Sequence, residues 1–293
     1  MTYFTQYSAV KKGQKTGVRS LLRHLALDVF AVKDSLNGAA SVLNKPRVQF
    51  LYIHHVFKDE EAGLVKLLQF LAKYHTFISY TEAVDRVLNG RIDKSYIAIS
   101  SDDGFKNNLA AAKILNEFGA KACFFLNPGI IGEKDFEKIK SHCATRLNFP
   151  PVEFLDWDEV SQLQNAGHEI GSHTMWHINV AKTGNAEFSA DCEESKNILT
   201  KHCGPIKHFA FPYGRFFHFS EAARKIVFES GYISCASAER GCHIASGNIQ
   251  KEELCIRRDH VILDWKLSHI RHFLADNSRK ASAETNQFPY IRG

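Results

Sequence analysis

The feature that most constrains this fold is the regular alternation of short apolar runs with helical patterns after Pro46. The apolar runs have the length of buried strands, and they occur at residues 48–55, 96–100, 122–126, 168–172, 208–212, 232–236 and 254–258. Stretches with helical spacing separate them, at 60–74, 81–90, 107–118, 156–166, 186–202, 220–230 and 265–275. Near-continuous apolar strands joined by helices are typical of a parallel sheet covered by helices. Seven or so such units indicate an α/β barrel, and 293 residues suit a single barrel domain.

The sequence predicts three segments. Residues 1–45 are a basic N-terminal extension, of which 1–17 are expected to lack fixed structure. Within it, apolar residues at helical spacing predict an amphipathic helix over 18–36. This helix either packs on the outside of the domain, rests on an anionic membrane surface or forms a subunit interface. Residues 46–275 form the barrel, and 276–293 are expected to be a polar C-terminal tail.

Charge and cysteine usage bear on partners and location. Residues 1–45 hold seven basic and two acidic side chains, so they carry the whole formal net charge of +5 and leave the barrel neutral. A neutral body with a basic leader does not favour nucleic-acid binding. The seven cysteines are odd in number and form no C-x-x-C pair, which favours free thiols in a reducing compartment. No apolar signal core or membrane span is apparent, so we predict a cytoplasmic protein, with peripheral contact at the inner membrane face as an option.

Polar residues follow the ends of the predicted strands. They are His54, Asp102, Asp103, His173, Tyr213 and Arg258. In barrels of this kind the chemistry sits at the carboxyl ends of the strands. We therefore expect these side chains to share one site.

Two of these strand ends carry residue types that bind metals. Asp102 and Asp103 precede Gly104, and His173 and His177 are four residues apart in HTMWH, a spacing that places both rings on one face of a helical turn. Each motif alone is weak, because Asp-Asp-Gly is most often a solvated turn and HTMWH could be a packed hydrophobic turn. Together, one carboxylate and two imidazoles make an open three-ligand hydrolytic metal site, and the second carboxylate is then free to act as a base.

These motifs also carry a family resemblance. The runs YIHHV, ISSDDGF, GHEIGSHTMWH and FAFPYG, in that order, resemble the polysaccharide deacetylase family of carbohydrate esterases, in particular its permuted branch of poly-N-acetylglucosamine deacetylases. The likeness covers about residues 46–275. It implies a distorted (β/α)7 barrel that hydrolyses N-acetyl groups on sugars.

The resemblance also implies a role for each site residue. It assigns one divalent metal to Asp103, His173 and His177, with Zn²⁺ as the default and Co²⁺, Ni²⁺ or Fe²⁺ as alternatives. It makes Asp102 the general base and His54 the general acid. It places the backbone N–H of Tyr213 at the oxyanion. Because side chains alternate along a strand, we expect neighbouring His55 on the opposite face.

Two residues depart from the family pattern. Ser101 replaces an aromatic residue before the Asp pair, and Ala210 replaces an arginine that normally steadies the base. We predict that Arg258 takes over this second role by pairing with Asp102, with Arg257 as the fallback. His269 lies in a Leu-x-His sequence similar to a family motif, but we expect it to be structural because it falls inside the last helix.

The resulting prediction is a metal-dependent hydrolase that removes an N-acetyl group from an amino sugar. The sugar could belong to a polysaccharide, a lipid-linked glycan or a sugar nucleotide. Two alternatives remain: a deformylase or other C–N hydrolase on the same barrel, and a catalytically dead barrel that binds glycans or partners.

Overall fold

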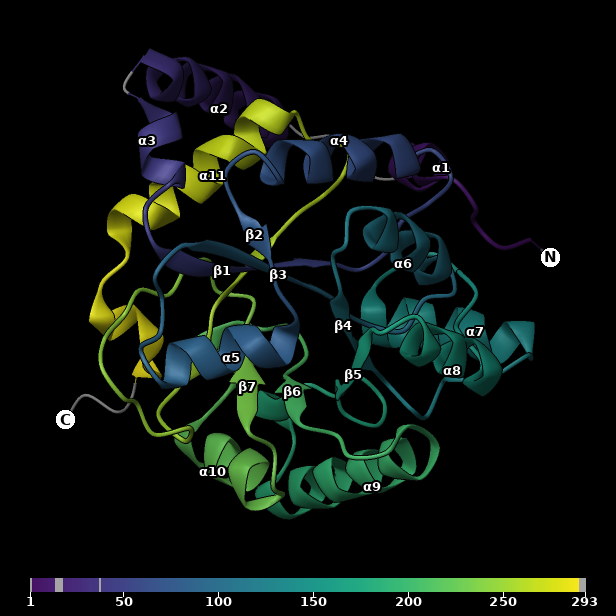
Figure 1. Ribbon diagram of the computed structural model, residues 1–293. Helices are drawn as coiled ribbons and strands as arrows, with labels where there is room; N and C mark the ends of the chain where they lie inside the picture. Colours follow the sequence, from purple (N-terminus) through teal and green to yellow (C-terminus); the bar gives the residue numbers. More distant parts are fainter. Residues whose placement is uncertain (1, 14–17, 37, 290–293) are drawn as a thin grey trace.

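The computed structural model describes residues 2–13, 18–36 and 38–289. Figure 1 looks along a barrel whose strands occupy the centre and whose helices surround them. The strands are β1 (Arg47–Ile53), β2 (Thr76–Phe77), β3 (Ser95–Ser101), β4 (Ala122–Leu126), β5 (Glu169–Ser172), β6 (His208–Ala210), β7 (Ser234–Ala236), β8 (Cys255–Ile256) and β9 (Arg258–His260). Their order in the sheet is β8-β7-β6-β5-β4-β3-β1-β9, with the short β2 added beside β3.

The sheet closes through a strand that is broken in the middle. β8 pairs with β7 and β9 pairs with β1, while Arg257 alone separates β8 from β9. All pairings between these named strands are parallel. Counting β8 and β9 as one interrupted strand gives seven barrel strands, which confirms the predicted distorted (β/α)7 barrel.

Helices cover the outside of the barrel. They are α4 (Glu61–Leu71), α6 (Asn108–Glu117), α7 (Phe136–His142), α8 (Trp157–Asn165), α9 (Asn185–Cys203), α10 (Glu221–Glu229) and α11 (Leu267–Lys280). Helix α5 (Tyr80–Leu88) differs, because its buried residues pack against the side chains that fill the barrel interior. The long excursion after β4 contains α7 and a π-helical turn, Cys143–Leu147. No described helix is long and apolar enough to span a membrane.

The two faces of the strands build two cores. Side chains at alternate positions, such as Phe50 and Phe125, fill the barrel interior beside the small Ala98 and Ala210. The intervening positions, such as Leu51 on β1, pack outward against the helices. This alternation places the side chains of Ser100 and Asp102 on the interior side, at the carboxyl end of β3.

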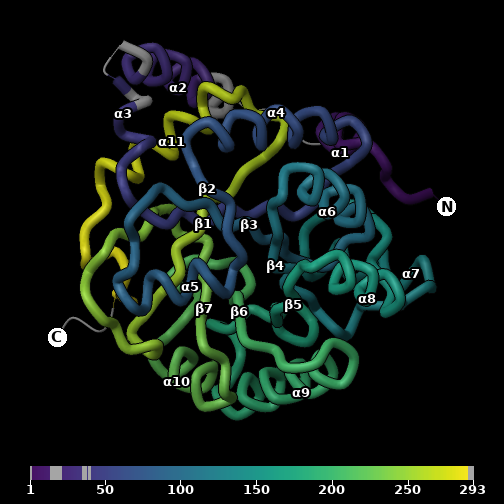
Figure 2. Tube along the Cα trace, viewed as in Figure 1, coloured from purple at the N-terminus to yellow at the C-terminus, as the bar shows by residue number. Residues whose placement is uncertain are grey.

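The N-terminal extension is more ordered than expected. Residues 7–12, predicted to lack structure, form helix α1 (Tyr7–Lys12), in which Val10 is buried against the barrel; residues 14–17 lie outside the described part. Helix α2 (Val18–Leu36) has the predicted bounds and lies with α3 (Ala39–Leu43) against α11 (Figure 2). The boundary at residue 45 is also too late, because Val42 and Leu43 already belong to the main core.

The C-terminal boundary at residue 275 is wrong for a similar reason. Helix α11 continues to Lys280, and a 3-10 turn follows at Ala283–Asn286. Asn286 and Phe288 are fully buried, and Asn286 accepts a hydrogen bond from buried His243. Tertiary packing therefore orders a segment whose composition is mainly polar.

Candidate active site

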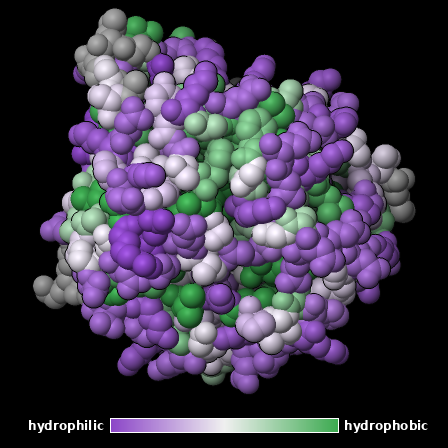
Figure 3. Space-filling model, in the orientation of Figure 1, coloured by the Kyte–Doolittle hydropathy of each residue, from purple (hydrophilic) through white to green (hydrophobic). Residues whose placement is uncertain are grey.

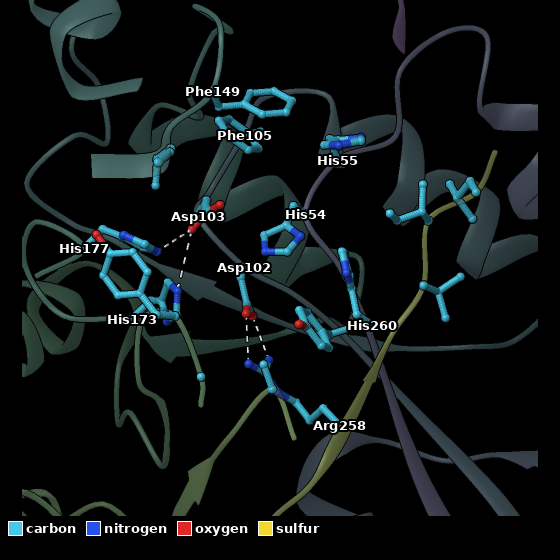
Figure 4. A pocket seen from close by; sticks show the side chains of 18 of the residues that line it. His54, His55, Asp102, Asp103, Phe105, Phe149, His173, His177, Arg258 and His260 are labelled. Carbon is cyan, nitrogen blue, oxygen red and sulfur yellow. Dashed lines mark hydrogen bonds and ion pairs between the residues drawn. The ribbon is translucent and has the colours of Figure 1, made fainter. Parts of the chain in front are cut away.

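The residues predicted to form the site do meet in one pocket at the carboxyl ends of the strands (Figure 4). The cavity has a volume of about 380 Å³. Its walls include all seven predicted site residues: His54, Asp102, Asp103, His173, His177, Tyr213 and Arg258. The molecular face in Figure 3 is mostly hydrophilic, with smaller hydrophobic areas between the hydrophilic residues.

Asp102 is held by a buried arginine from the last barrel strand. Arg258 Nη1 and Nη2 donate to the two carboxylate oxygens of Asp102 at 2.7 and 2.9 Å, while its Nε donates to the Ser237 carbonyl at 2.9 Å. The Arg258 guanidinium also lies over the rings of Tyr52 and Phe125, 4.5 and 5.2 Å from their centroids. Burial alone would raise the pKa of Asp102, but the charge and hydrogen bonds of Arg258 hold that pKa at about 2. Asp102 is therefore ionised and fixed in orientation, as the predicted pairing required.

Asp103 lies beside the two histidines of the HTMWH segment. Its Oδ1 is 3.6 Å from His173 Nε2 and 3.5 Å from His177 Nε2. These three atoms lie within 4.8 Å of one another, and all three residues are buried. The distances are too long for hydrogen bonds, so the three atoms surround a common point without satisfying one another.

Backbone turns, rather than a helix, bring these ligand candidates together. The backbone of Asp103 is left-handed, with φ of 74°, which turns its side chain to the same side as that of Asp102. His177 likewise has φ of 53°, so the expected helical turn in HTMWH is replaced by an irregular turn, and the rings of His173 and His177 lie 5.0 Å apart. Asn127, at the end of β4, anchors this turn by donating to the backbone carbonyls of His173 and Thr174. Such strained conformations persist only when the surroundings fix them, and they cluster at functional sites.

The donor set fits a divalent metal ion. Asp103 Oδ1 is buried without a hydrogen-bond partner, and burial together with the charge of Asp102 raises the pKa of Asp103. A cation at this point would offset both costs. Nδ1 of His173 donates to the Ala210 carbonyl at 2.7 Å, which leaves the Nε2 lone pair for an ion. Burial lowers the pKa of His173 and His177, so both rings stay neutral, as metal ligands must be.

Comparison with known proteins agrees with this geometry. The family model for polysaccharide deacetylase matches residues 89–233, which include the Asp pair, both histidines of HTMWH and Tyr213. This match covers just under half of the chain. A curated relative, a peptidoglycan-N-acetylglucosamine deacetylase of Bacillus cereus, is 29% identical over 142 residues, which are 47% of this chain and 44% of that protein. The chain thus spans less than half the length of this relative.

Solved structures share the fold. IcaB from Ammonifex degensii matches with a TM-score of 0.60 and 18% identity, over 80% of this chain and 98% of that one. The Streptococcus pyogenes deacetylase PplD, solved in complex with acetate, matches with a TM-score of 0.61 and 16% identity, over 78% and 99%. At these identities the likeness establishes the barrel fold alone.

The structure accounts for both departures from the family pattern. Ser101 is buried and donates to the side chain of Asn108, so this position stabilises the end of β3. Ala210 is fully buried, and its carbonyl accepts a hydrogen bond from His173. Arg258 reaches Asp102 from β9. The fallback, Arg257, donates instead to the Thr285 carbonyl and does not approach Asp102.

His54 and His55 do not follow strict strand alternation. β1 ends at Ile53, so both histidines lie beyond the strand and both line the pocket. The expectation that His55 points to the other face is therefore wrong. His54 faces Asp102 and His173, and burial lowers its pKa to about 4 although Asp102 opposes this effect. His269, by contrast, lies on α11 and pairs with Asp28 of α2, outside the site.

Several pocket residues were missed by the sequence reasoning. The ring of His260, on β9, lies 4.9 Å from that of His54 and 4.8 Å from that of Tyr52. Tyr7, Glu60 and Phe149 form another wall. A strand-end signal existed for His260, because it follows Arg258 by two residues, but no local pattern marks the other three.

Proposed function

We propose that this protein is a metal-dependent hydrolase that removes the N-acetyl group from an amino sugar of a glycan and releases acetate. The observation that carries the proposal is a single pocket in which the Asp103, His173 and His177 trio lies beside an arginine-held carboxylate, Asp102. The peptidoglycan relative supports the substrate class. A divalent ion, Zn²⁺ by default, would supply Lewis-acid polarisation of the acetyl carbonyl when bound to this trio.

The chain's own residues supply the remaining chemistry. Asp102 accepts a proton from the attacking water molecule, and Arg258 keeps this carboxylate ionised and aimed at the cavity. The backbone N–H of Tyr213 would donate to the carbonyl oxygen as negative charge develops there. Tyr213 lines the pocket, and its backbone is left-handed, with φ of 62°.

The leaving nitrogen needs a proton, and His54 is the proposed donor. It lies across the pocket from the HTMWH segment and next to Asp102 (Figure 4). With a pKa near 4 it is neutral in the free protein, so its acid form depends on nearby negative charge. Charge that develops on the carbonyl oxygen during attack would raise that pKa, because an opposite charge favours the protonated ring, and the ring then takes up a proton from solvent. His54 passes this proton to the nitrogen as the C–N bond breaks, and the proton that Asp102 accepted from water returns to solvent, which leaves acetate and a free amine.

The direct test is product analysis over a panel of N-acylated amino sugars. Protein with its bound metal quantified is incubated with N-acetyl and N-formyl substrates, and acetate, formate and free amine are measured. We expect acetate and amine in equal amounts. Formate without acetate would indicate a deformylase, and full metal occupancy without release of either acid would indicate a binding barrel.

Location and membrane contact are further proposals. All seven cysteines are free thiols and six are buried, which supports a cytoplasmic setting.

Helix α2 exposes four apolar side chains at helical spacing, Leu22, Leu25, Val29 and Val32. This face supports contact with an anionic membrane. Co-sedimentation with phosphatidylglycerol vesicles tests this idea. Val29→Glu should reduce binding, whereas equal binding by this variant would contradict it.

A further inference from the structure

The described part of the N-terminus, residues 2–13, forms a strap that is fastened beside the active-site pocket. The strap contacts three separate loops of the barrel: the Phe4 amide donates to the Pro151 carbonyl (3.0 Å), the Tyr7 and Ser8 amides donate to the Asp59 carboxylate (2.8 and 2.9 Å), and Lys11 pairs with Asp264 (2.5 Å). Val10 is 3% exposed and packs in an apolar cluster with Phe57. The strap therefore has a fixed position relative to the catalytic residues.

This position makes Tyr7 part of the pocket wall. Its ring lies 5.1 Å from that of His55, and His55 in turn stacks on Phe149 at 5.4 Å with an interplanar angle of 25°. All three residues line the cavity. They form a continuous wall of flat rings, which we call the aromatic wall, next to His54.

The centre of the aromatic wall is fixed by a buried carboxylate. His55 Nδ1 donates to Glu60 Oε2 at 2.8 Å, and the same oxygen accepts the Phe57 amide at 3.0 Å. Glu60 is 4% exposed and lines the cavity, and its Oε1 is buried without a partner. This carboxylate therefore fixes the His55 ring at the cavity wall.

The surface depression continues past Tyr7. A second hollow of about 330 Å³ shares Tyr7, Glu60 and Leu263 with the catalytic pocket. The rest of its lining is polar or charged: Ser8, Lys11, Lys12, Asp59 and Asp264. A flat, partly apolar wall followed by a polar hollow matches a chain of sugars, whose rings have apolar C–H faces and hydroxyl rims.

We infer that the aromatic wall and the strap form a subsite for the sugar adjacent to the one that is deacetylated. The inference rests on the proposed function and narrows it, because the substrate is then a glycan of two or more sugars rather than a sugar nucleotide. Tyr7 and Phe149 provide ring surfaces, and His55 provides a nitrogen, Nε2, whose orientation Glu60 fixes through Nδ1. Glu60 is in this view a positioning residue.

The test compares affinities for N-acetylglucosamine and for its β-1,4-linked dimer and tetramer. Calorimetry is done in an Asp102→Asn background so that the ligands are not consumed. We expect the tetramer to bind at least about tenfold more tightly than the monomer, and Tyr7→Ala to remove most of that advantage. Tyr7→Phe should retain it, because the ring is kept. Tyr3→Ala is the matched control, since Tyr3 lies on the same strap but packs on Phe136 and does not line the cavity.

A second measurement tests the inference even if Tyr7→Ala does not fold. In protein that keeps the native strap sequence, hydrogen exchange at the Tyr7 and Ser8 amides should slow when the tetramer binds and should not change with the monomer. Equal affinity for monomer and tetramer, or an unchanged tetramer advantage in folded Tyr7→Ala, would overturn the inference. Tyr7-dependent tetramer binding without acetate release from the wild-type protein would support the subsite while refuting the proposed hydrolysis.

Discussion

Both ends of the barrel bury an arginine, but the two arginines have different partners. At the carboxyl end, Arg258 is 1% exposed and binds both oxygens of Asp102. At the amino end, Arg47 is 0% exposed and its Nη1 donates to the backbone carbonyls of Leu43 and Lys45 at 2.7 and 3.0 Å. Its Nη2 donates to Nε2 of His75 at 2.7 Å.

The difference separates the end that carries the candidate active site from a structural end. Arg258 has one ionised partner, Asp102, which lines the candidate pocket, so its charge acts on the site. The groups that accept hydrogen bonds from Arg47 are neutral, and burial lowers the pKa of its guanidinium. Because it joins the Leu43 carbonyl of α3 to the side chain of Gln49 on β1, Arg47 ties these two elements together. Barrels of this type commonly divide their two ends in this way.

The largest expected effect is at the metal ligands. Asp103→Ala or His177→Ala should abolish metal binding and activity, because two remaining ligands hold a divalent ion weakly. Metal content by mass spectrometry and thermal unfolding check this. Full metal occupancy in both folded variants would show that the trio is not the binding site.

Removing the charge of Asp102 should have the next largest effect. Asp102→Asn keeps the shape of the carboxylate and leaves the trio intact, so metal should remain bound. Turnover should fall by about 10²–10⁴-fold, the usual loss for a general base. Near-normal acetate release from this variant would exclude Asp102 as the base.

The same substitution at both arginines tests the comparison directly. Arg258→Met should lower turnover by about 10–100-fold, as expected for a residue that orients a catalytic group. Arg47→Met should leave turnover per folded molecule unchanged but lower the free energy of unfolding by roughly 2–4 kcal/mol, because buried carbonyls lose their donors. Steady-state kinetics and urea unfolding of both variants provide the measurement. A large loss of turnover in Arg47→Met would remove the distinction between the two ends.

The smallest expected effect is a pH dependence of stability at the amino end. Burial and the neighbouring Arg47 charge lower the pKa of His75 to about 3 in the folded state, against an ordinary value of about 6.5 when unfolded. Between these values the unfolded chain binds a proton that the folded chain does not, so His75 lowers stability as the pH falls below about 6.5. His75→Gln should therefore make the free energy of unfolding less dependent on pH between 7 and 5. An unchanged slope would show that other buried histidines, such as His243, dominate.

The sequence by itself determined the barrel and its catalytic end. Apolar runs such as 96–100 and 122–126 have few alternatives to a buried parallel strand, and the bounds of β4 and α2 were predicted to the residue. Because parallel strands end at a common rim, residues that follow them had to meet, and Asp102, His173 and Arg258 do. This reasoning needs only chain periodicity and strand direction.

Only the tertiary structure decided how residues beyond the strands are arranged. The HTMWH turn, with its left-handed His177, is anchored by Asn127, which donates to the His173 carbonyl. The chain leaving β1 is anchored by Asn108, which donates to the His54 carbonyl. The same holds for the strap, whose polar sequence indicated no structure. Its position comes from the Asp59 carboxylate, more than fifty residues away along the chain, which binds the amides of Tyr7 and Ser8. Local propensity cannot register such long-range hydrogen bonds, because they form only after the barrel brings the two segments together.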